Sequence, residues 1–194
     1  MEILEIKDLE TLAKKRVPKM FFDYVNSGSW TETTYNENVS DFQKIKLRQR
    51  VAIDMSNRTL ETKMINQPVS MPVAIAPTGL TGMQRADGEI LAAQAAEEFG
   101  IPYTLSTMSV CSIEAVAEKT KKPFWFQLYV MKDKKFMERL IDRAKEAKCS
   151  ALVLTLDLQL LGQRHKDLRN GLSTPPKLIP KHIYQVLTKP MWCL

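Results

Sequence analysis

The stretch ALVLTLDLQLLGQR, at residues 151–164, carries side chains that could do chemistry. It opens as an apolar, β-rich run, and Thr155, Asp157 and Arg164 lie at and beyond the end of that run. A hydroxyl, a carboxylate and a guanidinium each cost free energy on leaving water unless they find a polar partner. One interpretation is that Thr155 and Asp157 only cap the segment that follows. The other is that this strand ends at a polar site shared with other strands.

Three further apolar runs share this design, since each ends in a small or polar residue and leads into an amphipathic helix. The four runs lie at 71–79, 101–109, 123–130 and 151–158. Helices are expected between them at 87–100, 112–120 and 133–148. Gly100 is expected to end the first of these helices, and Ser112 to cap the second. Uniformly apolar strands that alternate with helices are typical of a parallel sheet covered by helices.

Two architectures fit this alternation, a doubly wound sheet and a (β/α)8 barrel. The first strand-to-helix turn, APTGLTGMQRADG, has neither the G-x-G-x-x-G pattern of a dinucleotide-binding sheet nor the G-x-x-x-x-G-K-[ST] pattern of a P-loop. A barrel builds its active site at the carboxyl ends of its strands. Candidate functional residues occupy that position in all four runs: Ala76, Pro77 and Thr78; Ser106; Gln127 and Tyr129; Thr155 and Asp157. Four strands in the same phase favour the barrel and the shared site.

The regions on either side of these runs have a different pattern. Two short helices are expected in DLETLAKKR and PKMFFDYVNSG, and irregular or short antiparallel structure at 40–70, closing one end of the sheet. After Asp157 the segment LSTPPKLIPKHIYQVLTKP predicts a proline-broken loop with one helix. We therefore expect one domain with N-terminal helices and a barrel-closing segment at about 1–70, strands one to four at 71–158, and an active-site loop region at 159–194.

The composition excludes several classes of protein. A chain of 194 residues that is 44% hydrophobic can bury an ordinary globular core. No run approaches the roughly 18 apolar residues of a membrane span, and MEILEIKDLE is too acidic for a signal peptide, so a cytoplasmic protein is expected. The net charge of +6 comes from Lys and Arg mixed with Asp and Glu, which indicates solvated helix faces rather than a nucleic-acid surface. A basic bias after residue 163 leaves room for peripheral contact with anionic lipid at the inner face of the plasma membrane.

The cysteines do not form a pattern that binds metal. Cys111, Cys149 and Cys193 are far apart and are not accompanied by clustered histidines. Neither a disulfide framework nor a metal site is predicted.

Five segments, in order along the chain, match one family: PKMFFDYVNSG, MPVAIAPTG, LSTMSVCSIEAVA, FWFQLYV and LTLDLQLLGQRHKDLRNGL. They resemble the FMN-dependent α-hydroxy-acid dehydrogenases and oxidases, the family that contains glycolate oxidase, flavocytochrome b2 and bacterial L-lactate dehydrogenase. The resemblance implies an α/β fold of the (β/α)8 TIM-barrel type, with FMN as cofactor and a small L-2-hydroxy acid as substrate. The segment STMSVCSIE is closer to bacterial lactate dehydrogenases than to plant glycolate oxidases, which favours oxidation of L-lactate to pyruvate.

The resemblance also implies a set of cofactor-binding residues: Ala76, Pro77, Thr78, Gly79, Ser106, Gln127 and Thr155. The first four would pass beside the reactive edge of the flavin ring, and the last three would hydrogen-bond the ring. Neutral donors and acceptors can orient a planar heterocycle and tune its electronics without placing a competing charge beside it.

Four residues are assigned to substrate and catalysis by the same resemblance. Tyr24 and Tyr129 match the two tyrosines that contact substrate, and Arg164 matches an arginine that can attract and bind the substrate carboxylate. Asp157 would accept a hydrogen bond from the catalytic histidine and stabilise its protonated form. Tyr129 and Asp157 are thus the predicted catalytic residues. Without the motif context, Tyr24 is better explained as a helix–core residue and Arg164 as a surface charge.

The resemblance is incomplete, because the family's catalytic histidine, second substrate arginine and phosphate-binding rim lie beyond its fourth strand. The chain has two histidines, His165 and His182, and neither stands in the family's histidine motif. We therefore expect the N-terminal half of a barrel, inactive alone, from an enzyme that is a homo-oligomer when full length. The alternative is a non-catalytic half-barrel that acts as a binding or interaction module, or the product of a truncated gene.

Overall fold

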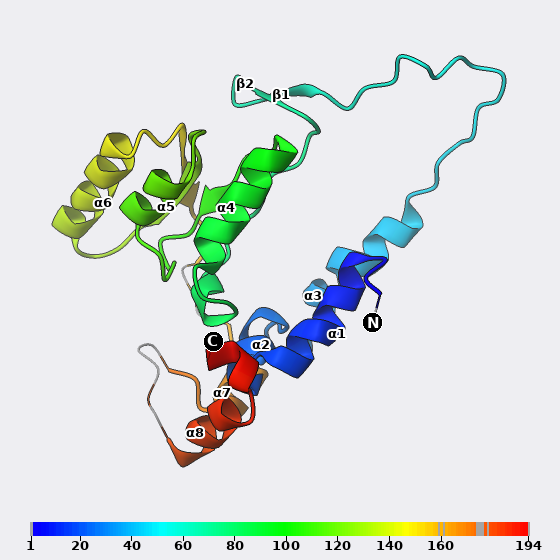
Figure 1. The fold of residues 1–194 in the computed structure, drawn as a ribbon. Coiled ribbons are helices and arrows are strands. Elements are labelled where there is room, and N and C mark those ends of the chain that lie inside the picture. Colours follow the sequence, from blue (N-terminus) through cyan, green and yellow to red (C-terminus); the bar gives the residue numbers. More distant parts are fainter. Residues whose placement is uncertain (1, 159, 161, 174–176, 178, 194) are drawn as a thin grey trace. The chain divides into compact units, whose positions relative to one another are not determined.

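The computed structural model describes the chain except for residues 1, 159, 161, 174–176, 178 and 194. It divides into two compact units, one formed by residues 1–53 with 160–194 and the other by residues 54–159 (Figure 1). The first unit contains α1 (Ile6–Arg16), α2 (Lys19–Val25), α3 (Thr33–Ser40), η1 (Asp41–Lys44), α7 (His165–Asn170), α8 (Pro180–Leu187) and α9 (Pro190–Cys193). The second contains β1 (Thr62–Met64), β2 (Gln67–Val69), η2 (Thr81–Met83), α4 (Gly88–Phe99), β3 (Thr104–Leu105), α5 (Ile113–Lys119), β4 (Trp125–Tyr129), α6 (Lys134–Glu146) and β5 (Ala151–Thr155).

The sheet of the second unit is parallel, with strand order β3-β4-β5. This confirms a parallel strand–helix arrangement, although these three strands do not form a closed barrel. The expected first strand, at 71–79, is reduced to a single parallel bridge between Ile75 and Tyr103. Pro72 and Pro77 lie on either side of Ile75, and neither can donate a backbone N–H to a ladder. The prediction of a full strand here was wrong for this reason.

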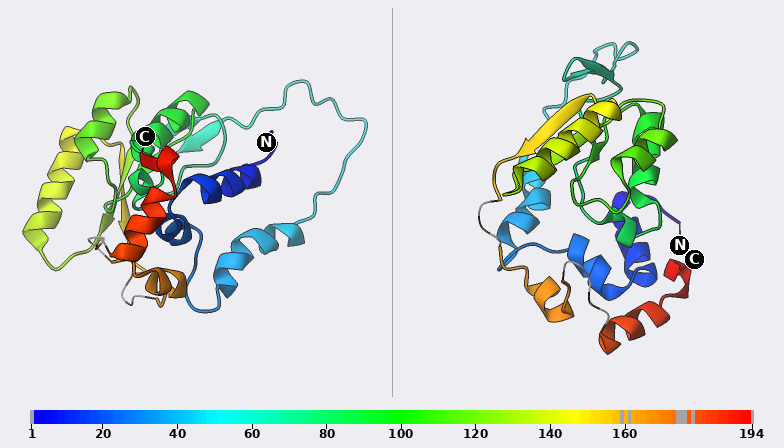
Figure 2. Two further views of the ribbon diagram at one scale, coloured as in Figure 1. Left: turned by 60° about the horizontal axis from the view of Figure 1, so that its bottom comes forward. Right: turned by 90° about the vertical axis from the view of Figure 1, so that its left-hand side faces the viewer.

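The three predicted helices of this unit form where the sequence placed them. The Ser112 side chain accepts a hydrogen bond from the Ala115 backbone N–H and caps α5, and Gly100 ends α4 in the left-handed conformation, with φ of 79°. The helices α4, α5 and α6 lie beside the sheet (Figure 2). Their apolar residues pack into one core cluster with alternate residues of β3 and β4.

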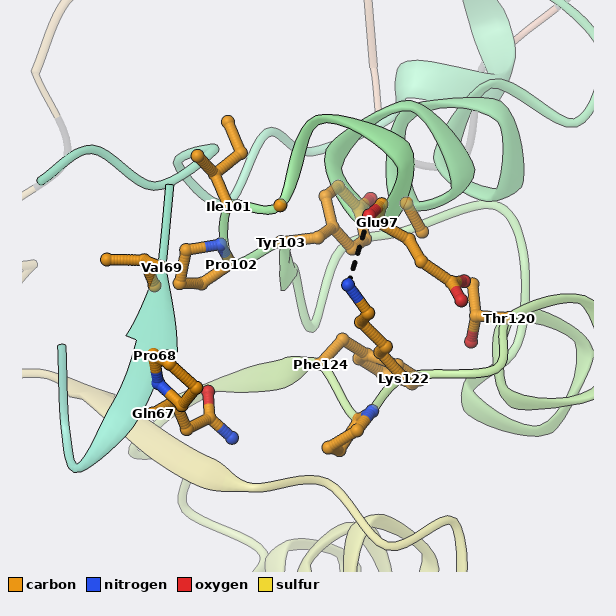
Figure 3. A pocket seen from close by; sticks show the side chains of 13 residues that line it. Gln67, Pro68, Val69, Glu97, Ile101, Pro102, Tyr103, Thr120, Lys122 and Phe124 are labelled. Carbon is orange, nitrogen blue, oxygen red and sulfur yellow. Dashed lines mark hydrogen bonds between the residues drawn. The ribbon is translucent and has the colours of Figure 1, made fainter. Parts of the chain in front are cut away.

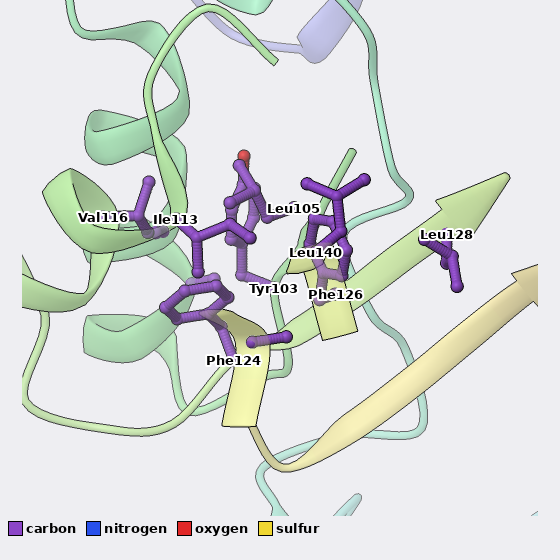
Figure 4. Packing of buried hydrophobic residues seen from close by; sticks show 11 residues of the cluster. Tyr103, Leu105, Ile113, Val116, Phe124, Phe126, Leu128 and Leu140 are labelled. Atoms are coloured by element: carbon purple, nitrogen blue, oxygen red, sulfur yellow. The ribbon is translucent and has the colours of Figure 1, made fainter. Parts of the chain in front are cut away.

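The strands have two different faces. Tyr103, Leu105, Phe126 and Leu128 point into the core cluster with the helices (Figure 4). Because side chains alternate along a strand, Gln127 and the residues in phase with it lie on the opposite face. The residues on this second face are Thr104, Ser106, Trp125, Gln127, Tyr129, Ala151, Val153 and Thr155. The polar ends of the strands therefore share one face.

Residues 62–69 form a hairpin, which confirms the short antiparallel structure expected within 40–70. Strands β1 and β2 pair antiparallel. Gln67 Oε1 accepts a hydrogen bond from Trp125 Nε1 (3.2 Å), and the Ser70 N–H donates to the Gly100 carbonyl (2.9 Å). The hairpin is thus attached to the amino-terminal end of the sheet, opposite to the ends that carry the predicted site.

The first unit is built around α2, whose buried residues include Met20, Phe21 and Phe22. It packs against α7 and α8, and Asn170 Nδ2 donates to Asp23 Oδ2 (2.7 Å). The one helix predicted in the segment LSTPPKLIPKHIYQVLTKP is confirmed as α8, whereas α7 and α9, which the described residues also form after residue 157, were not predicted. Gly171, with φ of 70°, ends α7, and Pro180 begins α8 at a position that needs no backbone donor. The helices α3 and η1 were not predicted.

Candidate functional site

Three polar side chains at the carboxyl ends of β3, β4 and β5 form a hydrogen-bonded row. Gln127 Nε2 donates to Thr155 Oγ1 (2.7 Å), and Ser106 Oγ donates to Gln127 Oε1 (3.4 Å). Ser106 and Gln127 are 2% and 1% exposed, and Thr155 is half-buried. The structure therefore brings together the three residues that were predicted to bind the flavin ring.

The backbone after β3 fixes the orientation of this row. The Thr107 N–H donates to Gln127 Oε1 (3.1 Å), and the Thr107 hydroxyl donates to the Gln127 carbonyl. The Met108 N–H donates to Ser106 Oγ (3.1 Å). Two donors at Oε1 and an acceptor at Nε2 leave the Gln127 amide one favourable orientation. The sequence analysis missed Thr107, because its contacts depend on the tertiary position of Gln127.

The predicted flavin-edge segment, residues 76–79, follows the single bridge at Ile75. Ala76, Pro77 and Thr78 are exposed, and Gly79 is half-buried. The Thr78 hydroxyl donates to the Ala76 carbonyl (3.4 Å), and the Thr81 hydroxyl donates to the Thr78 carbonyl (3.0 Å). Because residues 76–78 are exposed, a ligand could reach this segment.

Two predicted substrate residues meet in the first unit. The guanidinium carbon of Arg164 lies 4.7 Å from the centroid of the Tyr24 ring, a cation–π arrangement. Arg164 Nη2 also donates to the Tyr24 carbonyl and to Ser27 Oγ (2.9 Å). Arg164 is therefore neither a free surface charge nor unrelated to Tyr24, although the two residues are 140 positions apart.

Asp167 completes this group and was not identified from the sequence. Its Oδ2 lies 2.7 Å from Arg164 Nε, and its side chain is 16% exposed. Burial raises the pKa of Asp167 and the Asp23 carboxylate raises it further, while the Arg164 guanidinium offsets part of this effect. The i, i+3 spacing of arginine and aspartate in RHKD is the one sequence signal for this pair. The Asp167 carboxylate neutralises part of the positive charge of Arg164, and so reduces the charge available to attract an anion.

The two predicted catalytic residues lie in the second unit. Tyr129 is the last residue of β4, is half-buried and shares a face with Gln127. Asp157 follows β5, is exposed and has no hydrogen-bond or ion-pair partner among the described residues. Both histidines of the chain belong to the first unit. There His182 is fully buried with its ring nitrogens facing the carbonyls of Lys177 and Asn170. Within the second unit, Asp157 therefore has no histidine to orient.

A cavity of about 250 Å³ lies at the other end of the sheet (Figure 3). It is lined by the hairpin, the end of α4 and the starts of β3 and β4, including Val69, Tyr103 and Phe124. Glu97 and Lys122 are its charged residues, and Lys122 Nζ donates to the Glu97 carbonyl (3.5 Å). None of the predicted site residues lines it, so the candidate site is the polar row and not this cavity.

No group of three or more His, Cys, Asp or Glu is arranged to hold a metal ion in the described part of the chain. Among the same residues, no helix has the length and apolar character needed to cross a bilayer.

Parallel strand–helix units with a polar row at the carboxyl ends of their strands define the class of the fold, which is part of a TIM-type α/β barrel. The chain belongs to the FMN-dependent dehydrogenase family, because residues 13–194 match the sequence model of that family.

Relatives agree with this membership. The chain is 46% identical over 192 residues to an L-lactate dehydrogenase of Acinetobacter baylyi, covering 99% of this chain and 50% of that protein. The crystal structure of the monotopic membrane protein (S)-mandelate dehydrogenase superposes with a TM-score of 0.92 at 33% identity, over 100% of this chain and 52% of that one. A lactate oxidase of Pediococcus acidilactici superposes with a TM-score of 0.85 at 29% identity, over 96% and 52%. The chain thus spans about half the length of these proteins.

Proposed function

We propose that this chain is the N-terminal part of an enzyme that uses FMN to oxidise a small L-2-hydroxy acid, with L-lactate as the substrate. The observation that carries the proposal is the row of Ser106, Gln127 and Thr155 on the sheet face opposite to the helices. The resemblance of the sequence to lactate dehydrogenases supports the choice of L-lactate.

The residues of the second unit fit a flavin ring. The row offers an amide and two hydroxyls and no charge, which suits a neutral, planar heterocycle with several polar edges. The accessible backbone of 76–79 would lie along the ring edge. FMN, when bound, supplies a two-electron acceptor for the oxidation of the hydroxyl-bearing carbon.

The resemblance assigns four residues of this chain to the substrate and to catalysis. The Arg164 guanidinium can pair with a carboxylate, and its stacking on Tyr24 keeps the planar group in one orientation. The phenol of Tyr129 is suited to hydrogen-bonding a substrate oxygen. Asp157, which lacks a partner among the described residues, is available to hold and charge-stabilise a histidine. By the resemblance, that histidine and the phosphate-binding rim belong to the later half of the barrel.

The test is lactate-dependent reduction of a dye by purified residues 1–194 with FMN. It is run with and without the later half of the A. baylyi relative, expressed as a separate chain. We expect turnover only when both halves are present, because the proton acceptor is absent from this chain. Turnover by residues 1–194 alone would contradict the assignment of the roles. A complex that forms but binds no flavin would favour the alternative, a non-catalytic interaction module. Light scattering on the active complex tests the expected homo-oligomer.

We also propose a peripheral contact with an anionic lipid surface through α8. Ile183, Tyr184 and Leu187 are 49%, 70% and 74% exposed and lie at helical spacing on one side of α8. Lys181 and Lys189 lie within and just after the helix. Apolar residues beside basic residues on one helix are the features of an interfacial helix. A structural relative is a monotopic membrane protein, which supports the proposal.

Co-sedimentation with vesicles tests this contact. We expect binding to vesicles that contain phosphatidylserine, little binding to phosphatidylcholine vesicles, and a loss of binding in Leu187→Glu. Equal sedimentation with both lipids would contradict an electrostatic contribution, and unchanged binding of Leu187→Glu would contradict the role of α8.

A further inference from the structure

Glu89, the second residue of α4, is fully buried, with 0% of its surface exposed. A buried carboxylate is costly unless hydrogen bonds compensate its charge. Glu89 has no part in the proposed chemistry, so its burial calls for another explanation.

The partners of Glu89 come from two different loops. Its Oε1 accepts from the Gly82 N–H (3.0 Å), in η2 after the flavin-edge segment, and from the Val110 N–H (2.9 Å), in the loop after β3. Burial raises the pKa of Glu89, but these two bonds and its own backbone N–H outweigh that effect, so the pKa lies below its usual value. One oxygen atom of Glu89 therefore joins two loops.

Both of these loops lead to the proposed flavin-ring site. The Thr81 hydroxyl, next to Gly82, donates to the Thr78 carbonyl (3.0 Å). The Leu80 N–H donates to the Met108 carbonyl (2.9 Å), and the Met108 N–H donates to Ser106 Oγ (3.1 Å). A displacement of either loop would thus be transmitted to Thr78 or Ser106.

The two loops pack closely against each other and against the start of α4. A Cβ on Gly82 would lie 2.7 Å from Val110 Cβ, and a Cβ on Gly88 would lie 2.7 Å from the Thr81 carbonyl oxygen. Glu89 Oε2 has no hydrogen-bond partner among the described residues. The charge of this carboxylate is therefore compensated mainly by the two loop amides, with further contributions from its own backbone N–H and from the Cys111 side chain.

We propose that Glu89 is a positioning residue, which holds the loop after 76–79 and the loop after β3 in the arrangement that presents Thr78 and Ser106 to the flavin ring. This inference rests on the proposed function. Glu89 Oε1 performs this role by accepting hydrogen bonds from the Gly82 and Val110 N–H groups. The neutral amide oxygen of a glutamine at the same position should therefore substitute for it.

The first experiment is amide hydrogen exchange on residues 1–194. We expect Glu89→Ala to speed the exchange of the Gly82 and Val110 amides at least tenfold, and Glu89→Gln to change it less than threefold. Glu118→Ala, which removes an exposed carboxylate from α5, is the matched control and should leave both rates unchanged. Wild-type rates in Glu89→Ala would overturn the proposal. If Glu89→Ala unfolds, so that the amides of β4 also lose protection, Glu89→Gln decides. Retained protection at Gly82 and Val110 then supports the proposal, and lost protection overturns it.

The second experiment is a titration of the same variants with riboflavin, which offers the ring without the phosphate, followed by flavin fluorescence. We expect Glu89→Ala to bind at least fivefold more weakly than wild type, and Glu89→Gln and Glu118→Ala to match wild type. Equal binding by Glu89→Ala would overturn the positioning role even if the exchange results hold. A wild-type chain that binds no riboflavin would count against the proposed flavin site and the positioning role, while the exchange rates separately report whether Glu89 joins the loops.

Discussion

Replacing Thr155 with valine tests the polar row directly. Valine keeps the β-branched shape of threonine but removes Oγ1, the acceptor for Gln127 Nε2 at 2.7 Å. Because Gln127 is 1% exposed, its Nε2 would lose this partner in a buried position. An unsatisfied buried donor costs about 1–3 kcal/mol. Thr155 is only half-buried, so some water can reach the group, and we expect the free energy of unfolding to fall by about 1–2 kcal/mol. For a chain of this size the melting temperature would fall by about 2–8 °C.

The assay is urea unfolding of residues 1–194, with a thermal melt on the same samples. Thr62→Val is the matched control, since Thr62 lies exposed on β1 and its hydroxyl has no partner among the described residues. Thr155→Ser, which retains the hydroxyl, should recover most of the loss. If Thr155→Val stays within about 0.5 kcal/mol of the control, the inference that Thr155 holds the Gln127 amide is refuted.

Three further predictions concern a surface ion pair and the two predicted catalytic residues. Arg143 donates to Glu114 through Nε and Nη2 (2.6 and 2.7 Å) and lowers the pKa of Glu114 to about 2. Because both side chains are more than one-third exposed, Arg143→Ala should lower the free energy of unfolding by only about 0.5 kcal/mol at pH 7. This contribution is complete above the pKa of Glu114 in the unfolded chain, near 4.5, and is lost as the pH falls to about 2. Urea unfolding should therefore give wild type and variant similar free energies of unfolding at pH 2, and a difference that does not change with pH would contradict the pairing. In the reassembled enzyme, Tyr129→Phe should lower the turnover rate more than the melting temperature, because it deletes one hydroxyl and keeps the ring; an unchanged rate in steady-state kinetics would count against a substrate contact. Asp157→Asn should slow substrate oxidation with flavin content nearly intact, because in the proposed function the carboxylate would stabilise a histidinium that exists only after proton transfer. Loss of flavin, measured by absorbance, would instead indicate a structural role.

Features that depend on local sequence were predictable. The cap of α5 at Ser112 and the end of α4 at Gly100 follow from side-chain and backbone preferences that act within one turn. The alternation of apolar runs and helices was sufficient to predict the parallel sheet and to place Ser106, Gln127 and Thr155 at one edge of it.

Features that depend on distant partners were not predictable from the residues alone. The stacking of Arg164 on Tyr24 joins positions 140 apart, and the role of Asp167 depends on that contact. The buried Glu89 was not singled out from the sequence, because its two amide partners come from separate loops. The failed first strand is different, since Pro72 and Pro77 gave a local reason to expect only a bridge.

The division of the first unit between the two ends of the chain has a consequence for folding during synthesis. The second unit is continuous and can begin to fold as soon as it leaves the ribosome. α2 cannot pack against its partners until much later, because Asn170, which donates to Asp23 of α2, is 147 positions further along the chain. Since synthesis proceeds at about 5–20 residues per second, Phe21 and Phe22 of α2 would lack the contacts of α7 and α8 for on the order of ten seconds. α2 is thus made before the second unit and docks after it, and during that interval its apolar residues would be exposed to association with chaperones.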